Sequence, residues 1–236
     1  MKINTLYNEP CLETMAKMPD NFIDLTITSP PYNLGEKHHT GNNRFSAYEE
    51  YIDDLPEGKY QEEQINVLNE LYRVTKQGGS IFYNHKNRIK DGASIIPYTW
   101  ILKTRWTIKQ ELVWFNRSQN FDKCRFYPMT ERIYWLSKGV QTNFHNAINQ
   151  HDLIRLTPEG TGSQHKRAFP LNLVRKFIIC FEDAKLIYDP YCGSGTTPSA
   201  AILEGRDWIA SEITKTYCDI SNKRILTHIN APQLFN

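Results

Sequence analysis

Apolar and polar positions alternate along this chain in a way that predicts short strands separated by helices. Residues 24–28 form a short β-rich run that stops at two prolines, which indicates a buried strand leading into a rigid loop. Residues 60–76 place apolar side chains three and four positions apart, as an amphipathic helix does. The glycine pair 78–79 predicts the end of that helix, and residues 80–83 predict the next strand.

The rest of the chain repeats this alternation of strands and helices. It predicts strands over residues 111–115, 132–136, 186–188 and 208–210, and helices over residues 171–181, around 200–203 and over 215–228. Such alternation indicates an α/β fold with a mostly parallel sheet, which binds its ligands at the carboxyl ends of the strands. Residues 34–59 and 139–166 are two long polar connections, and long connections are usually functional lids or disordered segments.

Composition narrows the class of protein. A chain of 236 residues fits one domain, or one domain with a small appendage. A hydrophobic fraction of 40% and a charged fraction of 23% are average for a soluble globular protein. The net charge of +2 identifies no partner. Basic residues do gather in the middle third, which a solvated face alone would also explain.

Two absences add to this interpretation. The first residues lack the apolar core of a signal peptide, and no apolar stretch approaches the roughly 18 residues of a membrane span. The five cysteines are scattered and show neither a Cys-x-x-Cys pair nor metal-ligand spacing with a histidine. We therefore expect a cytoplasmic protein with free thiols, no metal site and no membrane contact.

A glycine-rich loop is the first candidate for chemistry. Between a predicted strand and a predicted helix the chain reads Gly193, Ser194, Gly195, Thr196 and Thr197. Glycines allow a ligand close to the backbone, and the helix offers unpaired N–H groups. The loop lacks the Gly-Lys-Ser/Thr ending of a nucleoside triphosphate site. Glu212, at the tip of the next strand, can hold a ribose, so the pair suggests a nucleoside cofactor without a long phosphate tail. A tight turn with a surface glutamate stays the alternative.

The second candidate is the run Thr-Ser-Pro-Pro-Tyr-Asn at residues 28–33. Its prolines remove two backbone donors, so the loop presents carbonyl oxygens with few competing N–H groups. Ser29 adds an acceptor and Tyr32 adds a flat ring. This combination suits a planar molecule that carries an amino group, although a proline turn with a packing tyrosine would have the same sequence.

Together the two motifs resemble those of the β class of S-adenosylmethionine-dependent DNA amino-methyltransferases, which methylate cytosine N4 or adenine N6. In that class the catalytic motif precedes the cofactor loop, as it does here, whereas most methyltransferases have the reverse order. The resemblance extends to residues 7–12, 18–24, 78–83, 114–117 with 132–136, and 165–170. It implies one methyltransferase domain over residues 1–236, with a Rossmann-like, mixed and mostly parallel sheet, helices on both faces and a circularly permuted order.

The resemblance also implies roles for single residues. The catalytic residues would be Ser29, Pro30, Pro31 and Tyr32. S-adenosylmethionine would be bound by Glu9, Pro10, Thr28, Phe169, Asp189, Pro190, Cys192, Gly193, Ser194, Gly195, Thr196, Thr197 and Glu212. Double-stranded DNA would be contacted by Lys37, Arg44, Arg117, Lys123 and Arg125, with residues 34–59 as a DNA-facing loop.

Two positions depart from the family pattern. Where the family has an aspartate before the Cys-Leu pair, this chain has Pro10, so that adenosine contact is either lost or moved to Glu9. The segment expected to recognise the target sequence, residues 139–166, is short, which argues against elaborate recognition by a monomer. A homodimer is compatible with this, and a cognate restriction endonuclease on a separate chain stays open.

The mechanism implied by the resemblance is direct attack of a base amino group on the sulfonium methyl. Ser29 and the Pro30 carbonyl would accept the two amino hydrogens, which orients the nitrogen and stabilises its developing charge. A base inside a duplex is out of reach, so it would be flipped out and stacked on Tyr32.

Alternatives stay open for the base that is methylated and for the class of substrate. Serine before Pro-Pro-Tyr is associated in the family with cytosine N4, and adenine N6 is the nearest alternative. A protein or RNA amide methyltransferase is disfavoured by the permuted order and by the basic residues between the strands at 111–115 and 132–136. A non-catalytic DNA-binding module is disfavoured by the presence of both motifs.

Overall fold

One sheet of eight strands forms the centre of the molecule in the computed structural model, which describes residues 1–35, 53–116, 125–140, 144–146, 148–156 and 170–229. In spatial order the strands are β1 (Thr5–Tyr7), β10 (Asp207–Ser211), β9 (Leu186–Asp189), β2 (Ile23–Thr28), β3 (Thr75–His85), β7 (Thr130–Ser137), β6 (Thr107–Phe115) and β8 (Leu153–Arg155). β7 runs antiparallel to its neighbours β3 and β6, and all other pairs in the sheet are parallel.

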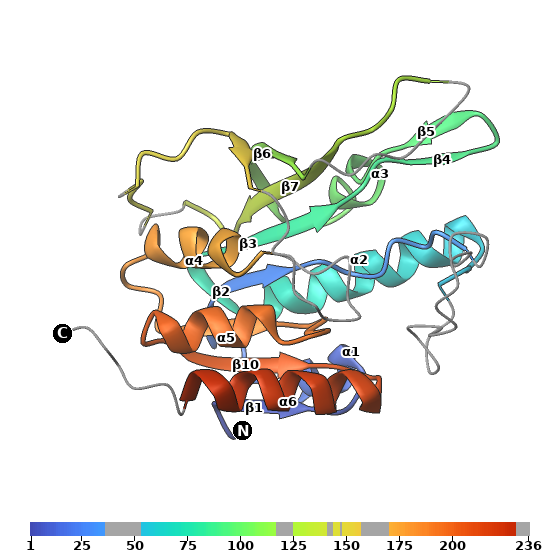
Figure 1. Cartoon of the computed structure of the whole chain (residues 1–236). Helices are drawn as coiled ribbons and strands as arrows, with labels where there is room; N and C mark the ends of the chain where they lie inside the picture. Colours follow the sequence, from blue (N-terminus) through green and yellow to red (C-terminus); the bar gives the residue numbers. More distant parts are fainter. Residues whose placement is uncertain (36–52, 117–124, 141–143, 147, 157–169, 230–236) are drawn as a thin grey trace.

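Helices cover both faces of this sheet (Figure 1). One face carries α1 (Cys11–Ala16), α2 (Glu57–Val74) and α3 (Tyr98–Ile101), and the other carries α4 (Leu171–Ile179), α5 (Thr196–Leu203) and α6 (Lys215–Ile229). A two-stranded hairpin of β4 (Arg88–Lys90) and β5 (Ala93–Ile95) stands apart from the sheet. The predicted α/β, Rossmann-like fold with a mixed, mostly parallel sheet is confirmed.

Alternating side chains of the inner strands supply the two cores. In β3, Ile81 and Tyr83 face the helices α1 to α3, whereas Phe82 faces α4 to α6. The Phe82 ring stacks on Phe177 of α4 with 4.0 Å between ring centroids. On the opposite face, the buried Tyr83 hydroxyl donates to Gln64 Oε1 of α2 at 2.8 Å. A sheet that is apolar on both faces requires cover on both, as parallel sheets generally do.

The order of the strands brings two distant parts of the sequence together. β2, near the amino end of the chain, pairs in parallel with β9, near the carboxyl end, through Leu25 with Ile187 and Thr26 with Tyr188. The loops that leave both strands therefore start at the same edge of the sheet. This edge is where ligands bind in α/β sheets.

One predicted boundary is wrong. The glycine pair 78–79 does not end a helix, because α2 ends at Val74 and the extended Thr75 leads at once into β3. Gly78, with φ of 77°, donates its N–H to Lys138 O at 2.9 Å inside the strand. The other predicted helices and strands overlap observed ones, and β3, β6 and β7 are longer than predicted. The short elements β1, α1, β4, β5, α3 and β8 had no sequence prediction.

Gly79→Ala is expected to destabilise the fold by about 1 to 3 kcal/mol, the usual cost of overpacking a core. A Cβ at this position would lie 2.6 Å from Thr75 Cγ2 and 2.9 Å from the backbone oxygens of Asp24 and Lys76. Urea unfolding measures the effect. Gly58→Ala in α2 is the matched control, because nothing lies within 4 Å of its added Cβ. The control should stabilise the helix by up to about 1 kcal/mol; equal effects of both changes would contradict this explanation.

Candidate active site

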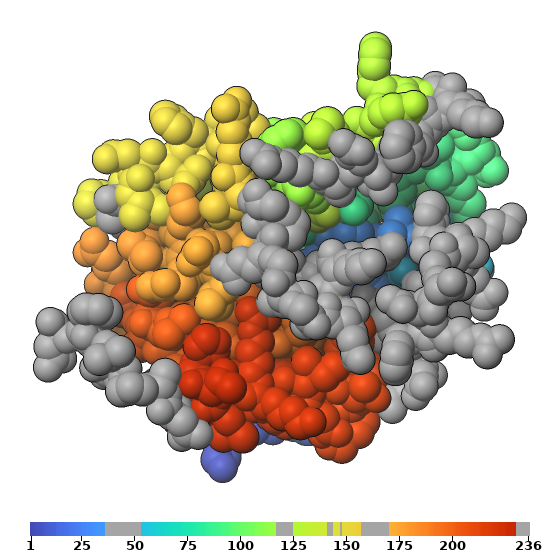
Figure 2. Space-filling model, viewed as in Figure 1, coloured from blue at the N-terminus to red at the C-terminus, as the bar shows by residue number. Residues whose placement is uncertain are grey.

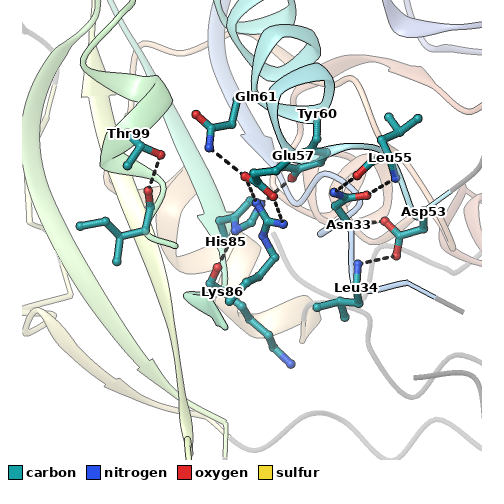
Figure 3. Close-up of polar contacts among 12 residues, drawn as sticks. Asn33, Leu34, Asp53, Leu55, Glu57, Tyr60, Gln61, His85, Lys86 and Thr99 are labelled. Carbon is teal, nitrogen blue, oxygen red and sulfur yellow. Dashed lines mark hydrogen bonds and ion pairs between the residues drawn. The ribbon is translucent and has the colours of Figure 1, made fainter. Parts of the chain in front are cut away.

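The turn that follows β2 is held rigidly by the segment that precedes α2. Asn33, with φ of 54°, donates through Nδ2 to Leu55 O at 2.9 Å and accepts from Leu55 N at 2.6 Å. Asp53 receives the Asn33 N–H at 2.6 Å and the Leu34 N–H at 3.4 Å (Figure 3). These paired contacts fix the backbone of the turn before any ligand binds.

A buried histidine supports the same turn from behind. The Tyr60 hydroxyl donates to Pro31 O at 2.7 Å. It also lies 2.6 Å from His85 Nε2, and His85 Nδ1 lies 2.7 Å from Lys86 O (Figure 3). Burial lowers the pKa of His85 to about 3. His85 is therefore an uncharged, structural side chain at physiological pH, and its ring links the Tyr60 hydroxyl to the Lys86 carbonyl.

Polar side chains from three strands meet at Ser29. The Ser29 Oγ lies 2.7 Å from the Tyr32 hydroxyl, which donates to Glu131 Oε2 at 3.0 Å. Asn84, at the end of β3, donates to the same Glu131 oxygen at 2.7 Å. Asn116, just beyond β6, donates to Glu131 Oε1 at 2.9 Å. The turn after β2 thus lies against a hydrogen-bonded group of two hydroxyls, two amides and one carboxylate.

The glycine loop after β9 has the geometry its sequence suggests. Gly195, with φ of 81°, is the N-cap of α5, and a Cβ there would overlap the Ser221 hydroxyl. The Gly193 N–H donates to Glu212 Oε2 at 2.8 Å, and the Thr214 N–H donates to Glu212 Oε1 at 2.9 Å. The carboxylate at the tip of β10 is thereby fixed against the loop.

Asp189 joins the two loops. Its Oδ1 accepts from the Thr28 hydroxyl at 2.8 Å and from the Tyr191 N–H at 3.0 Å. Thr28 ends β2 and Asp189 ends β9, so this contact ties the turn at residues 29–34, predicted to be catalytic, to the glycine loop at residues 193–197. Desolvation of the fully buried carboxyl raises the pKa of Asp189 to about 6, against hydrogen bonds from Thr197, Thr28 and Tyr191 that lower it.

Both loops line one cavity of about 350 Å³, within the range of small-molecule sites. In the space-filling view, blue atoms of the amino-terminal part are visible below the green region and above the red region (Figure 2). The acidic residues along its wall are Glu9, Asp53, Glu63, Glu131, Asp189 and Glu212. Lys86 is the basic residue among the described residues of this wall. A negatively charged lining favours a cationic ligand and disfavours a phosphate.

Most predicted site residues lie on this cavity. Those that line it are Ser29, Pro30, Pro31, Tyr32, Glu9, Pro10, Asp189, Pro190, Cys192, Gly193, Ser194, Thr196, Thr197 and Glu212. Two further predicted residues do not line the cavity but contact or adjoin residues that do. Thr28 donates to Asp189, and Gly195 is the N-cap of α5. The carboxylate of Glu9 accepts from the Thr14 hydroxyl at 2.8 Å and pairs with Lys17 at 2.5 Å.

Of the five predicted DNA contacts, the structure describes one. Four of them lie outside the described residues: Lys37, Arg44, Arg117 and Lys123. The predicted cofactor contact Phe169 also lies outside them. Arg125 is described and is exposed between β6 and β7. Within the part of the chain that the structure describes, no group of three or more His, Cys, Asp and Glu side chains could hold a metal ion, and no helix is long and apolar enough to cross a membrane.

Sequence reasoning missed the amide and carboxylate group behind Ser29. Asn84 could have been found, because it follows the predicted strand at 80–83 and so lies near a carboxyl end. Glu131 could not, because it is the second residue of β7, the strand that runs antiparallel to its neighbours in the eight-stranded sheet. Its side chain reaches the site only through the pairing of β7 with β3 and β6.

Comparisons with known proteins agree with this geometry. A family model of N6/N4 type, described as DNA methylase, matches residues 23–223. The orphan methyltransferase M.BamHII of Bacillus amyloliquefaciens is 26% identical, over 89% of this chain and 91% of its own. The type II methyltransferase M.ScaI of Streptomyces caespitosus is 24% identical, over 93% of this chain and 80% of its own.

Solved structures show the same fold. The cytosine-N4-specific PvuII DNA methyltransferase superimposes with a TM-score of 0.78 at 20% identity, covering 95% of this chain and 86% of its own. A Thermus thermophilus protein in complex with S-adenosyl-L-methionine superimposes with a TM-score of 0.72 at 17% identity, covering 96% of this chain and 94% of its own.

The raised pKa of Asp189 predicts a pH-dependent stability. Because the folded protein holds this proton up to about pH 6 and the unfolded chain only to about 3.8, the contribution of Asp189 to stability falls as pH rises between these values. Asparagine does not ionise, so Asp189→Asn removes this loss of stability with rising pH. The stability of the variant relative to wild type should therefore rise by on the order of 2 kcal/mol from pH 4 to pH 6 and stay level above.

Urea unfolding at several pH values between 4 and 7.5 measures this difference. Asp183→Asn is the matched control, because Asp183 is exposed and should show no such rise. A constant difference between Asp189→Asn and wild type across this range would contradict the assignment.

Proposed function

Since the chain belongs to the N6/N4 family of DNA methylases, we propose that it methylates the exocyclic N4 of a cytosine flipped out of double-stranded DNA. The family depends on S-adenosylmethionine as its methyl donor, so the chain is an S-adenosylmethionine-dependent DNA methyltransferase. The single observation that carries the proposal is the Thr28–Asp189 contact of 2.8 Å, since it fixes the catalytic turn and the glycine loop on one cavity.

The cavity fits the cofactor in charge and shape. S-adenosylmethionine carries a sulfonium and an ammonium group, and Asp189 and Glu212 provide carboxylates on the same wall. We assign Glu212 to the ribose and the Gly193–Gly195 turn to the close approach of the backbone. Bound there, the cofactor supplies a methyl group already activated by the positive sulfur.

The catalytic turn suits an amino group. Ser29 and the Pro30 carbonyl are proposed to accept the two amino hydrogens, so that the nitrogen lone pair points toward the glycine loop. The amino nitrogen of a base is a weak nucleophile, because its lone pair is delocalised into the ring. Orientation and stabilisation of its developing positive charge therefore supply the catalysis. The Tyr32 ring is proposed to stack on the flipped base.

Cytosine is favoured over adenine by two observations. The residue before Pro-Pro-Tyr is Ser29, which in the family accompanies N4 methylation, and the PvuII enzyme with the similar fold is cytosine-N4-specific. Adenine N6 is the alternative for the same chemistry. A protein or RNA amide substrate is a weaker candidate, because the family model is of DNA methylases.

Binding of the duplex is proposed to use the basic surface around the cavity. Arg125 would contact phosphates from the β6–β7 connection, and Lys37, Arg44, Arg117 and Lys123 stay predictions in segments outside the described residues. Phe169 stays a predicted cofactor contact for the same reason.

The organisation of the protein is proposed on similar grounds. The sheet takes strands from Thr5 to Ser211, which supports one methyltransferase domain over residues 1–236. We further propose residues 34–59 as a DNA-facing segment, although its last three residues begin α2 and are not loop. Residues 139–166, which include β8, are proposed as a short target-recognition segment. A cytoplasmic location is also proposed, since the family acts on DNA. A homodimer and a cognate restriction endonuclease remain proposals, supported by the short recognition segment and by the type II relatives.

The base is tested by incubating plasmid DNA with the protein and labelled S-adenosylmethionine, followed by nucleoside mass spectrometry. The expected product is N4-methylcytosine, and Ser29→Ala should reduce its yield by at least about tenfold. N6-methyladenine would replace the main proposal by its alternative. Label in protein or RNA, with none in DNA, would contradict both.

Glu212→Gln is expected to weaken S-adenosylmethionine binding about 10- to 100-fold, the effect of losing hydrogen bonds to a charged group. Isothermal titration calorimetry of the protein without DNA measures it. Glu204→Gln is the matched control, because Glu204 pairs with Arg175 at the end of α5 and does not line the cavity. An unchanged dissociation constant for Glu212→Gln would refute the ribose contact.

A further inference from the structure

Glu131 stands where four hydrogen-bond donors converge. Its Oε2 receives the Tyr32 hydroxyl at 3.0 Å and the Asn84 amide at 2.7 Å. Its Oε1 receives the Asn116 amide at 2.9 Å and pairs with the Lys86 ammonium at 3.1 Å. A carboxylate has about four acceptor positions, so this set of contacts matches an ionised group. The Glu131 side chain is only 9% exposed, yet it lines the active-site cavity.

These contacts give the hydrogen bonds at Ser29 a direction. A hydroxyl has one hydrogen, and that of Tyr32 points to Glu131. In the Ser29–Tyr32 pair, whose oxygens are 2.7 Å apart, Ser29 must therefore be the donor. The serine hydrogen therefore points to Tyr32. Ser29 Oγ accepts from Asn84 Nδ2 at 3.3 Å through one lone pair, and the other can accept an amino hydrogen. The chain runs from Ser29 through Tyr32 to Glu131.

The amide of Asn84 shows how strongly the carboxylate orders its surroundings. Asn84 turns its NH₂ group toward Glu131, Tyr32 and Ser29. This orientation leaves Asn84 Oδ1 buried and without a hydrogen-bond partner among the described residues. The opposite orientation would set two acceptors against each other at 2.7 Å, so the carboxylate determines how the amide lies.

Other bases near the catalytic turn are already engaged. Both ring nitrogens of His85 have partners, and burial lowers the pKa of His85 to about 3, so it accepts no proton near neutral pH. Asp189 holds Thr28 and Tyr191, and Glu212 holds Gly193 and Thr214. Among the described carboxylates of the cavity, Glu131 is the one joined to Ser29 through a hydroxyl.

We propose that Glu131 is a positioning residue that ends a proton relay from Ser29 through Tyr32. The proposal rests on the methyl transfer proposed above. As the N–CH₃ bond forms and the S–CH₃ bond breaks, the amino nitrogen releases one hydrogen to Ser29 Oγ. The Ser29 proton passes to the Tyr32 oxygen, and the Tyr32 proton passes to Glu131. The sulfonium and the carboxylate both end neutral, and Glu131 later returns the proton to solvent.

Tyr32→Phe separates this role from stacking, because it keeps the ring and removes only the hydroxyl. With DNA and S-adenosylmethionine saturating, the single-turnover rate constant should fall about 100-fold in Tyr32→Phe and in Glu131→Gln, the scale of general acid–base catalysis. The double variant should be no slower than either single one, since one relay is lost in each. The dissociation constants for cofactor and DNA should stay within about twofold of wild type.

A second measurement needs no turnover. In infrared difference spectra of the ligand-free protein, Tyr32→Phe should shift the Glu131 carboxylate band, and the shift should vanish in a Glu131→Gln background. Tyr98→Phe and Glu111→Gln are matched controls, because the hydroxyl of Tyr98 in α3 donates to Glu111 Oε2 of β6 at 2.7 Å and neither residue lines the cavity. The controls should keep the wild-type rate, and thermal unfolding checks that all variants fold.

Three outcomes would overturn the relay. These are a wild-type rate in Tyr32→Phe, multiplicative losses in the double variant, or an unshifted carboxylate band. A wild-type protein that methylates no DNA would instead refute the proposed function, whatever the infrared spectra show. Methylation of adenine by the wild type would change the base and leave the relay test as it stands.

Discussion

The structure depends on the parallel pairing of β2 with β9 and on the hydrogen bond that closes it, from the Thr28 hydroxyl to Asp189. These two residues are 161 positions apart in the sequence. The entropy lost in closing so long a segment grows only with the logarithm of its length, and the two apolar cores on either face of the sheet offset it. Asp189 remains tolerable in this buried position because three hydrogen-bond donors surround its carboxyl group. The strand pairing and this hydrogen bond are sufficient to bring the turn after β2 and the glycine loop together.

Around this contact, the site is rigid before a ligand arrives. Asn33 and Asp53 hold the backbone after the prolines, and Tyr60 holds Pro31 through a hydroxyl that also contacts His85. On the other side, the Gly193 N–H holds the carboxylate of Glu212. A reaction that relies on orientation and on stabilisation of developing charge gains from such fixed groups, because none has to reorganise during the transfer.

The sequence was sufficient for the parts of the fold that follow from local chemistry. The alternation of strands and helices predicted the α/β class, and the motifs at residues 28–33 and 193–197 predicted which loops line the cavity. The sequence did not predict features that depend on pairing between strands distant in the chain. The glycines at 78–79 look like a helix end but lie in β3, where Gly79 has no room for a side chain. Glu131 precedes the predicted strand at 132–136 and reaches Ser29 only because β7 runs antiparallel.

The charges of the molecule separate its two ligands. The cavity wall is acidic, so a cationic cofactor is attracted and DNA phosphates are repelled from the interior. Under the proposed function, a neutral flipped base would enter this cavity while the DNA backbone stays outside, where the exposed Arg125 is proposed to contact it. Transfer of the methyl group removes the positive charge of the sulfur, and the relay to Glu131 removes one negative charge from the wall. In the proposed relay the net charge of the loaded cavity is therefore the same before and after the reaction, so methyl transfer leaves no new charge to be compensated in the cavity.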